Sequence, residues 1–391
     1  MIYGDQIGSR ARDDMTMKDS QSGQLTRRQA IGLLGATVGS IGGVAAADAS
    51  PLQGRGGGRG GAGAGQGRGG GGRTPTKEWL DQVIEAPIET DIPIIDPHHH
   101  MSWTPGPSRY NLEDILADTK GNNIRQTVCV IGTNLIEWVN GCASEAASGV
   151  HGETHVAAGI VGGGNLMQGD AAAFELEKQM ADTRRFRGMR DSVGWTNPPV
   201  RPQNTKEHTL LDPQFQKGIA QVHRLGLSFE AWLYYNQLHD VVELAHKFPE
   251  LPIVLNHIGG ILGVGAWDGK IEEVFTAWKP AIKEVASCPN VTVKVGGLGM
   301  NYLNGFGWDK RPKPATSDEL VERNRRWWDY TIEVFTPSRC MFQSNFPPDK
   351  ESSSYTVVWN HFKKYSKHYT KAERAAMFHD TAMRVYRLSP V

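Results

Sequence analysis

The chain has 391 residues, and its 42 basic and 42 acidic side chains leave no formal net charge. Residues 74–391 alone carry 33 basic and 37 acidic side chains, and such a mildly acidic body is a poor binder of the nucleic-acid phosphate backbone. Four cysteines exclude a disulfide scaffold, and no apolar run reaches the roughly 18 residues of a membrane span. The composition favours a globular enzyme with a small-molecule substrate and leaves the oligomeric state open.

The first 47 residues have the features of an export signal. Arg27 and Arg28 precede an apolar run over 30–44, and three alanines at 45–47 supply the small residues that a signal peptidase needs. A twin arginine before a weakly hydrophobic segment is typical of Tat signals, whereas the alternative is an ordinary Arg pair before a fraying helix. We expect residues 1–47 to be removed on export, which places the mature protein in the periplasm or outside the cell.

A low-complexity segment follows the predicted signal. Residues 54–73 contain 13 glycines and four arginines, and such a chain cannot bury enough apolar surface to fold. The alternative interpretation is an RGG-like segment that binds nucleic acid, but residues 54–73 contain no aromatic residue for base stacking. The sequence therefore predicts a flexible linker over 48–75 and no nucleic-acid partner.

The remaining part, 76–391, alternates short β-rich runs with longer amphipathic stretches. The runs lie at 92–96, 126–131, 155–161, 186–191, 227–233, 252–257, 291–296 and 340–344. Helices are predicted at 111–119, 171–184, 213–225, 238–247, 271–287 and 318–335. Eight βα units predict a (β/α)₈ TIM barrel. A doubly wound open sheet would need a Gly-rich turn after its first strand, where this chain has Asp-Pro-His-His-His.

Strand alternation indicates which side chains face the barrel axis. Asp96, His98 and His100 share one side of the first strand. Glu230 and Lys294 also face inward, and two opposite charges in a barrel interior are expected to form an ion pair. Trp232 and Tyr234, on the same side as Glu230, would give the pocket an aromatic wall for a ring-shaped or planar substrate.

Three histidines stand at predicted carboxyl ends of strands, where catalytic groups of this fold lie. His98 and His100 are about 6.5 Å apart along one strand, which suits one metal ion or two donors to one substrate. His257 closes the sixth strand. One such histidine is most simply structural, but three at the same end of one barrel favour a catalytic site.

Five segments resemble the amidohydrolase-related TIM-barrel hydrolases, and the nearest branch is that of the sugar lactonases and 2-pyrone-4,6-dicarboxylate lactonase. The resemblance spans about residues 91–388 and rests on segments 95–100, 186–190, 255–260, 341–350 and 381–386. It implies hydrolysis of a lactone or related cyclic ester. Alternatives are a metal-dependent non-oxidative decarboxylase of the same superfamily and an exported binding barrel without catalysis.

The chain departs from the metal-loaded pattern of that family. Members with one metal use the His pair of strand 1, a His after strand 5 and an Asp after strand 8. Here the strand-5 end carries Tyr234, and Asn345 stands after strand 8. A neutral amide is a weak zinc ligand, so we expect no cofactor. The alternative is one zinc or manganese ion on His98 and His100, completed by Glu230 or Asp349.

Ester hydrolysis needs an activated water and donors for the developing oxyanion. Asp349 is the predicted general base, with Glu230 and Asp96 as alternatives, and a capping role as its structural explanation. The predicted catalytic set is thus Asp349 with the three histidines, which polarise the carbonyl. Arg190 is expected to hold a substrate carboxylate or to pair with an internal acid. The predicted substrate-binding residues are Arg190, Trp232, Tyr234, Asn345 and Lys294.

Overall fold

Eight parallel strands form one sheet in a computed structural model that describes residues 75–104 and 109–391. The strands pair in chain order from β1 to β8, as the barrel prediction requires. They are β1 (Ile94–His99), β2 (Ile124–Val130), β3 (His155–Gly162), β4 (Phe186–Ser192), β5 (Ser228–Trp232), β6 (Ile253–Leu255), β7 (Val291–Val295) and β8 (Cys340–Phe342). The predicted signal peptide, and the predicted linker up to residue 74, lie outside the described residues.

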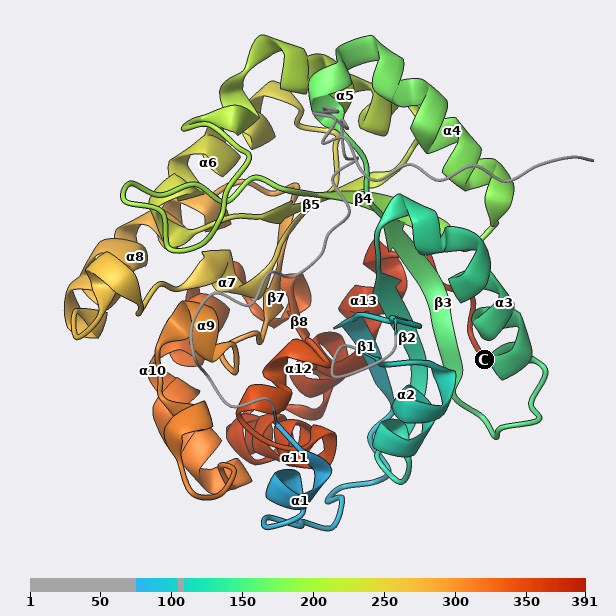
Figure 1. Cartoon of the computed structure of the whole chain (residues 1–391), viewed down its shortest axis with the longest axis vertical. Coiled ribbons are helices and arrows are strands. Elements are labelled where there is room, and N and C mark those ends of the chain that lie inside the picture. The colour runs from blue at the N-terminus through green and yellow to red at the C-terminus, as the bar shows by residue number, and fades with distance from the viewer. Residues whose placement is uncertain (1–74, 105–108) are drawn as a thin grey trace, which may run out of the picture. The chain divides into compact units, whose positions relative to one another are not determined.

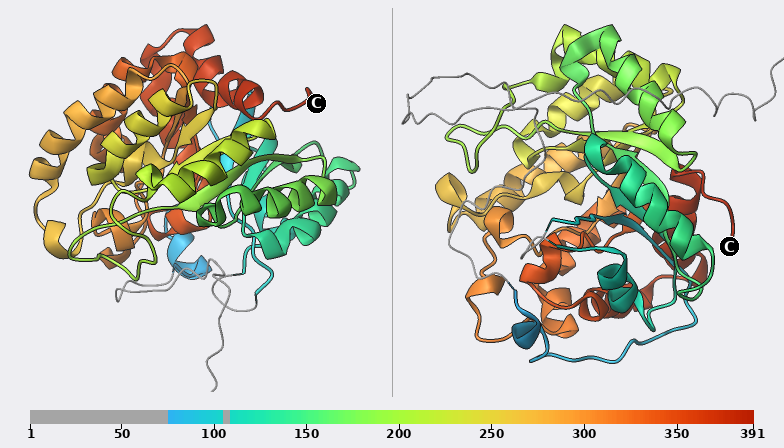
Figure 2. Two further views of the ribbon diagram at one scale, coloured as in Figure 1. Left: turned by 90° about the horizontal axis from the view of Figure 1, so that it is seen from above. Right: turned by 45° about the vertical axis from the view of Figure 1, so that its right-hand side comes forward.

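A longer helix follows each strand, so that strands and helices alternate along the chain (Figure 1). These helices are α2 (Leu112–Thr119), α3 (Ile136–Ala147), α4 (Ala172–Asp182), α5 (Pro213–Arg224), α6 (Leu238–Lys247), α8 (Ile271–Ala286), α10 (Ser317–Phe335) and α11 (Tyr355–Tyr365). Shorter helices are α1 (Lys77–Leu80), α7 (His257–Gly260), α9 (Asn301–Asn304), α12 (Lys371–Ala375) and α13 (Thr381–Val385). Figure 2 shows the helices around the strands from two further sides. Among the described residues, no helix combines the length and apolarity needed to cross a membrane.

Local sequence signals explain where several of these helices begin. Asn111 and Thr316 each cap a helix through a reciprocal capping box, with Asp114 and Glu319 at the third helical position. Asp212 caps α5, which then starts with a proline whose missing N–H would have no partner in the first turn. These three caps define where α2, α5 and α10 begin, at the points where the chain leaves a loop and returns along the outside of the sheet.

The seam between β8 and β1 closes the sheet beyond the end of β8. The Asn345 amide donates to the His98 carbonyl at 2.9 Å, and the His100 amide donates to the Phe346 carbonyl at 2.7 Å. The barrel is therefore nearly closed, and the residues that close it are those that follow the first and last strands. Candidate site residues from both ends of the sequence are held together by this seam.

The amino-terminal end of the barrel interior is filled by apolar side chains and by the last helix. Inward residues of β1, β2, β3, β6 and β8 pack against α13 and the residues after it; the cluster includes Ile95, Val128, Val130, Val161, Val254, Met341, Ala382, Val385 and Tyr386. The barrel interior is thus a packed apolar core at the amino-terminal end of the strands and a polar site at their carboxyl end, as is typical of this fold.

One predicted orientation in β1 is wrong. Asp96 does not face the axis: its carboxylate accepts hydrogen bonds from the Tyr355 hydroxyl of α11 and from the backbone amides of His98 and Ser344. The register of β1 against β2 shifts after Asp96, next to Pro97, which lacks an amide donor. The strict alternation that placed Asp96 on the same side as His98 therefore fails. Asp96 lies outside the barrel and stabilises the seam by accepting the hydrogen bond from the Ser344 amide.

Candidate active site

Residues from β1, β4, β5 and β7, and from the segments that follow β1 and β6, meet at the carboxyl end of the strands. His98 lies at the centre of this group, with ring centroids 5.0 Å from His100 and 4.7 Å from His257. The Nε2 atoms of His98 and His100 are 3.3 Å apart, and an Arg190 guanidinium nitrogen lies 3.4 Å from the same His98 nitrogen. Among the described residues, Arg190 forms no ion pair, so the alternative expectation that it pairs with an internal acid is not met.

The three rings are neutral at ordinary pH. Burial lowers the pKa of His98 and His257 well below the usual value, and the positive charges of Lys294 and Arg190 lower it further. Burial likewise lowers the pKa of His100 to about 3, with a smaller effect from Arg190. Each ring therefore carries one proton, and its neighbours decide which nitrogen holds it.

Hydrogen-bond partners with only one role settle the tautomers of His98 and His100. The Val130 carbonyl accepts from His100 Nδ1 at 2.7 Å, which leaves His100 Nε2 unprotonated. The Lys294 ammonium donates to His98 Nδ1 at 3.1 Å, which leaves the His98 proton on Nε2, facing the unprotonated Nε2 of His100. The Arg190 guanidinium, which is also a donor only, stays at the longer distance of 3.4 Å from His98 Nε2. His98 Nε2–H then donates to His100 Nε2 across the 3.3 Å separation.

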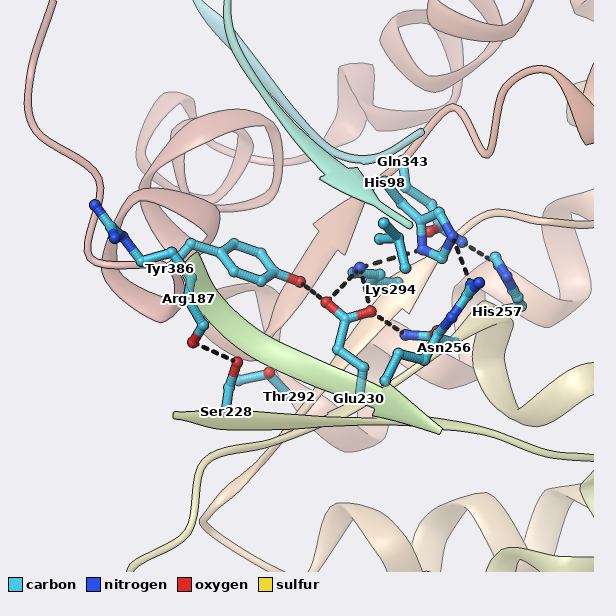
Figure 3. A network of polar contacts seen from close by, with 12 residues as sticks. His98, Arg187, Ser228, Glu230, Asn256, His257, Thr292, Lys294, Gln343 and Tyr386 are labelled. Carbon is cyan, nitrogen blue, oxygen red and sulfur yellow. Dashed lines mark hydrogen bonds and ion pairs between the residues drawn. The ribbon is translucent and has the colours of Figure 1, made fainter. Parts of the chain in front are cut away.

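The predicted ion pair between Glu230 and Lys294 is confirmed. The ammonium donates to both carboxylate oxygens at 2.8 Å, and both side chains are fully buried. The Tyr386 hydroxyl donates to one oxygen at 2.5 Å and the Asn256 amide to the other at 2.9 Å, as Figure 3 shows. No role was predicted for Tyr386 or Asn256, although both lie in the segments that resemble the family.

His257 follows β6 by two residues instead of closing the strand. Its backbone is left-handed, with φ of 53°, and Ile258 and Gly259 continue this conformation at 52° and 86°. The His257 ring contacts the Gln343 amide through Nδ1 at 2.6 Å and packs on Gly297, where any side chain would collide with it. Alternation from Asn345 would have placed Gln343 on the same side of its strand, which is the signal that could have found it.

Asp349 is buried beside Asn345 and a glycine-rich loop. Its carboxylate accepts from the Asn345 amide at 2.6 Å and from the Gly299 backbone amide at 3.1 Å. Burial raises its pKa to about 8, because these hydrogen bonds only partly offset the desolvation of the charged form. A Cβ at Gly299 would lie 2.8 Å from the Asp349 carboxyl carbon. The loop after β7 thus touches both Asp349 and, through Gly297, His257.

The predicted aromatic wall forms a cluster near the end of β5. Trp232 and Tyr234 meet edge to face with centroids 5.4 Å apart. The Arg201 guanidinium lies 5.3 Å from the Trp232 ring centroid and 5.8 Å from that of Tyr302. The sequence offers no local signal for Arg201 or Tyr302: Arg201 lies between β4 and α5 and Tyr302 in α9, and the two meet only in the folded barrel.

The comparison with known families agrees with this fold and site. A family model described as amidohydrolase matches residues 95–388. The chain belongs to this amidohydrolase family. The matched region contains each candidate site residue and runs from β1 to α13, so the family resemblance predicted from the sequence is confirmed.

Relatives of this amidohydrolase include proteins of known and unknown activity. It is 32% identical to the uncharacterized protein y4mH of Sinorhizobium fredii over 76% of the chain and all of the relative. It is 26% identical to L-fucono-1,5-lactonase of Burkholderia multivorans over 56% of the chain and 69% of that enzyme.

Solved structures share the fold of this amidohydrolase at lower identity. A Burkholderia multivorans amidohydrolase with bound zinc is 21% identical, with a TM-score of 0.61 over 76% of this chain and all of that one. A candidate 2-pyrone-4,6-dicarboxylic acid hydrolase from Pseudomonas putida is 16% identical, with a TM-score of 0.53 over 77% and 99% of the two chains. The zinc in the first structure means that the comparisons do not support the expected absence of a cofactor.

The residues of this amidohydrolase fit a divalent metal only in part. Two imidazole nitrogens on one tetrahedral zinc lie about 3.4 Å apart, close to the observed 3.3 Å between His98 and His100. A zinc-bound histidine normally donates its other N–H to an acceptor. His98 Nδ1 instead faces the Lys294 ammonium, which cannot accept a hydrogen bond. Arg190 adds a second cation, 3.4 Å from the other ring nitrogen, His98 Nε2. Across residues 75–104 and 109–391, no three His, Cys, Asp or Glu side chains form a metal-type group. The donor set as folded does not fit a metal.

Proposed function

We propose that this amidohydrolase hydrolyses a lactone or a related cyclic ester by attack of water on a polarised carbonyl, without a metal. The observation that carries the proposal is the electropositive cluster around His98. Neutral imidazoles, an unpaired Arg190 guanidinium and the Lys294 ammonium meet there, and no carboxylate among the described residues is hydrogen-bonded to any of the three rings. The similarity to L-fucono-1,5-lactonase supports the choice of a lactone.

The cluster supplies donors for an oxyanion. The His98 Nε2–H makes only a long hydrogen bond of 3.3 Å to His100, which a substrate oxygen can share, and the Arg190 guanidinium lies beside it; both groups donate without accepting. A carbonyl oxygen beside them gains negative charge as water attacks, and fixed donors in a buried site stabilise that charge. Arg190 also serves a substrate that carries its own carboxylate, since no protein acid neutralises it.

Asp349 is the proposed base. It takes one proton from the attacking water, whose oxygen forms the new bond to the carbonyl carbon. When the ring C–O bond breaks, the leaving alkoxide takes a proton, and protonated Asp349 is available to give it. Burial favours the protonated form of Asp349, whose pKa is raised to about 8, so it can act first as base and then as acid.

A lactone panel after chelation tests both the reaction and its independence of metal. We expect the purified protein to open at least one simple sugar or aliphatic lactone and to keep most of this activity after prolonged chelation. Stoichiometric metal, with activity lost on chelation and restored by zinc or manganese, would contradict metal independence and favour the decarboxylase alternative. A folded protein that opens no lactone would favour a binding barrel.

We further propose that the protein is exported by the Tat route, on the strength of the twin arginine, apolar segment and alanines in 1–47. Changing Arg27 and Arg28 together to lysine is expected to leave the precursor in the cytoplasm, because the paired arginines are what the route recognises. Cell fractionation and immunoblotting measure this, and a variant exported like the wild type would remove the assignment.

A further inference from the structure

We infer that Lys294, held in place by Glu230 and Tyr386, is a positioning residue that fixes the proton of His98 on Nε2 and thereby keeps divalent metals off the His98–His100 pair. The inference gives a physical basis to the metal-independent site proposed above and rests on that proposal for its catalytic meaning. Its evidence is a set of hydrogen bonds inside the barrel, which Figure 3 draws.

Every donor of Lys294 has an acceptor. Its three N–H groups match three partners, the two oxygens of Glu230 at 2.8 Å each and His98 Nδ1 at 3.1 Å. The side chain is fully buried, so no solvent competes for these donors. An ammonium can only donate, and His98 Nδ1 must therefore accept.

The carboxylate that orients Lys294 is itself fixed from two sides. Tyr386, from the end of the chain, donates to one oxygen of Glu230, and Asn256, next to His257, donates to the other. Each oxygen thus accepts two hydrogen bonds, and rotation of the carboxylate would break both pairs. The last helix at one end of the barrel is in this way connected to the imidazole at the other.

The consequence for metal binding follows from the proton on His98 Nε2. A metal ligand needs a lone pair on that atom, and here the lone pair is used by the N–H bond that is directed at His100. The distance between the two Nε2 atoms is that of a zinc site. Two other features distinguish this pair from a metal site: the proton on His98 Nε2, and the adjacent cations Lys294 and Arg190. Without Lys294, the nearby Glu230 carboxylate would favour a proton on His98 Nδ1, as in a carboxylate–histidine–zinc arrangement.

Zinc titration and nitrogen NMR of Lys294→Met test the inference. Long-range ¹H–¹⁵N spectra of the wild type are expected to show His98 as the Nε2–H tautomer, and the variant to show a shift toward Nδ1–H. The variant should bind one zinc per chain at least tenfold more tightly than the wild type, and adding His98→Gln should abolish that gain. Thr292→Val is the matched control, since it removes a hydroxyl from the same strand without a bond to His98.

Loss of the ammonium leaves Glu230 buried without its cation, so Lys294→Met is also made together with Glu230→Gln. The glutamine amide oxygen can still accept from His98 Nδ1, so the same tautomer shift is expected there. If neither variant folds, the tautomer of the wild type still decides. An Nδ1–H tautomer in the wild type, wild-type zinc bound through His98, or unchanged zinc affinity in a folded variant would each overturn the inference. A wild type that opens lactones but has the opposite tautomer would defeat this inference alone. The expected tautomer without lactone hydrolysis would defeat the proposed function alone.

Discussion

Replacing Asp349 with asparagine is expected to lower kcat for lactone opening by about 10²–10⁴-fold while the barrel stays folded, the range typical for loss of a general base. The amide cannot take a proton from water. It can keep one of the two hydrogen bonds that the carboxylate makes, to Asn345 or to the Gly299 amide, so the cost in stability is about 1 kcal/mol. Steady-state kinetics and thermal unfolding of the same preparation measure both effects.

The pH dependence gives this prediction a second signature. Burial raises the pKa of Asp349 to about 8, so the base is protonated below that pH and the wild-type rate should rise with pH through about 8. The stability of the wild type changes with pH in the opposite direction to its rate. A folded-state pKa above the unfolded value adds stability that is complete below about pH 4 and is lost as pH rises through about 8. The asparagine variant has no such loss, so its stability relative to the wild type should increase from pH 6 to pH 9.

A variant that keeps more than about a tenth of wild-type kcat would show that Asp349 is not the base. The two alternative acids from the sequence are then also poor choices. Glu230 is neutralised by Lys294 and accepts four hydrogen bonds, and Asp96 faces Tyr355 outside the barrel. His257, with a neutral ring beside His98, would be the next candidate for activating water.

The order of strands and helices could be predicted because each leaves a local pattern. Short β-rich runs, separated by amphipathic stretches, identify all eight strands, and helix α6 has the predicted bounds. Alternation also predicted the Glu230–Lys294 pair, because β5 and β7 are regular and both charges fall on the inward side. Regular geometry was sufficient for these features.

The features that the sequence did not predict depend on irregular backbone or on distant contacts. The register shift at Pro97 turns Asp96 outward, and four consecutive left-handed residues from His257 to Gly260 place His257 beyond the strand end. Tyr386 meets Glu230 across 156 residues of sequence. No local pattern around either residue predicts this hydrogen bond, because it forms only when the last helix packs into the end of the barrel.

Replacing His257 is the second change for which we expect a large loss of activity. His257→Ala removes a polar group next to His98 and the partner of Gln343, and loss of one oxyanion-type donor typically lowers kcat by about 10²–10³-fold. Histidine already bears the cost of a Cβ in the left-handed conformation, so alanine loses stability mainly because the buried Gln343 amide is left without its partner, a cost of about 1–3 kcal/mol.

His257→Asn separates these two effects. Asparagine tolerates a φ of 53° and keeps a side-chain donor and acceptor, so its melting temperature should stay close to that of the wild type, and its kcat should fall less than that of the alanine variant. Combining His257→Asn with Asp349→Asn should lower kcat by less than the product of the single effects, because both groups act on one transition state. If both His257 variants instead lost stability and kept near-normal turnover in the folded fraction, His257 would be a packing residue on Gly297. The catalytic cluster would then consist of His98, His100 and Arg190 alone.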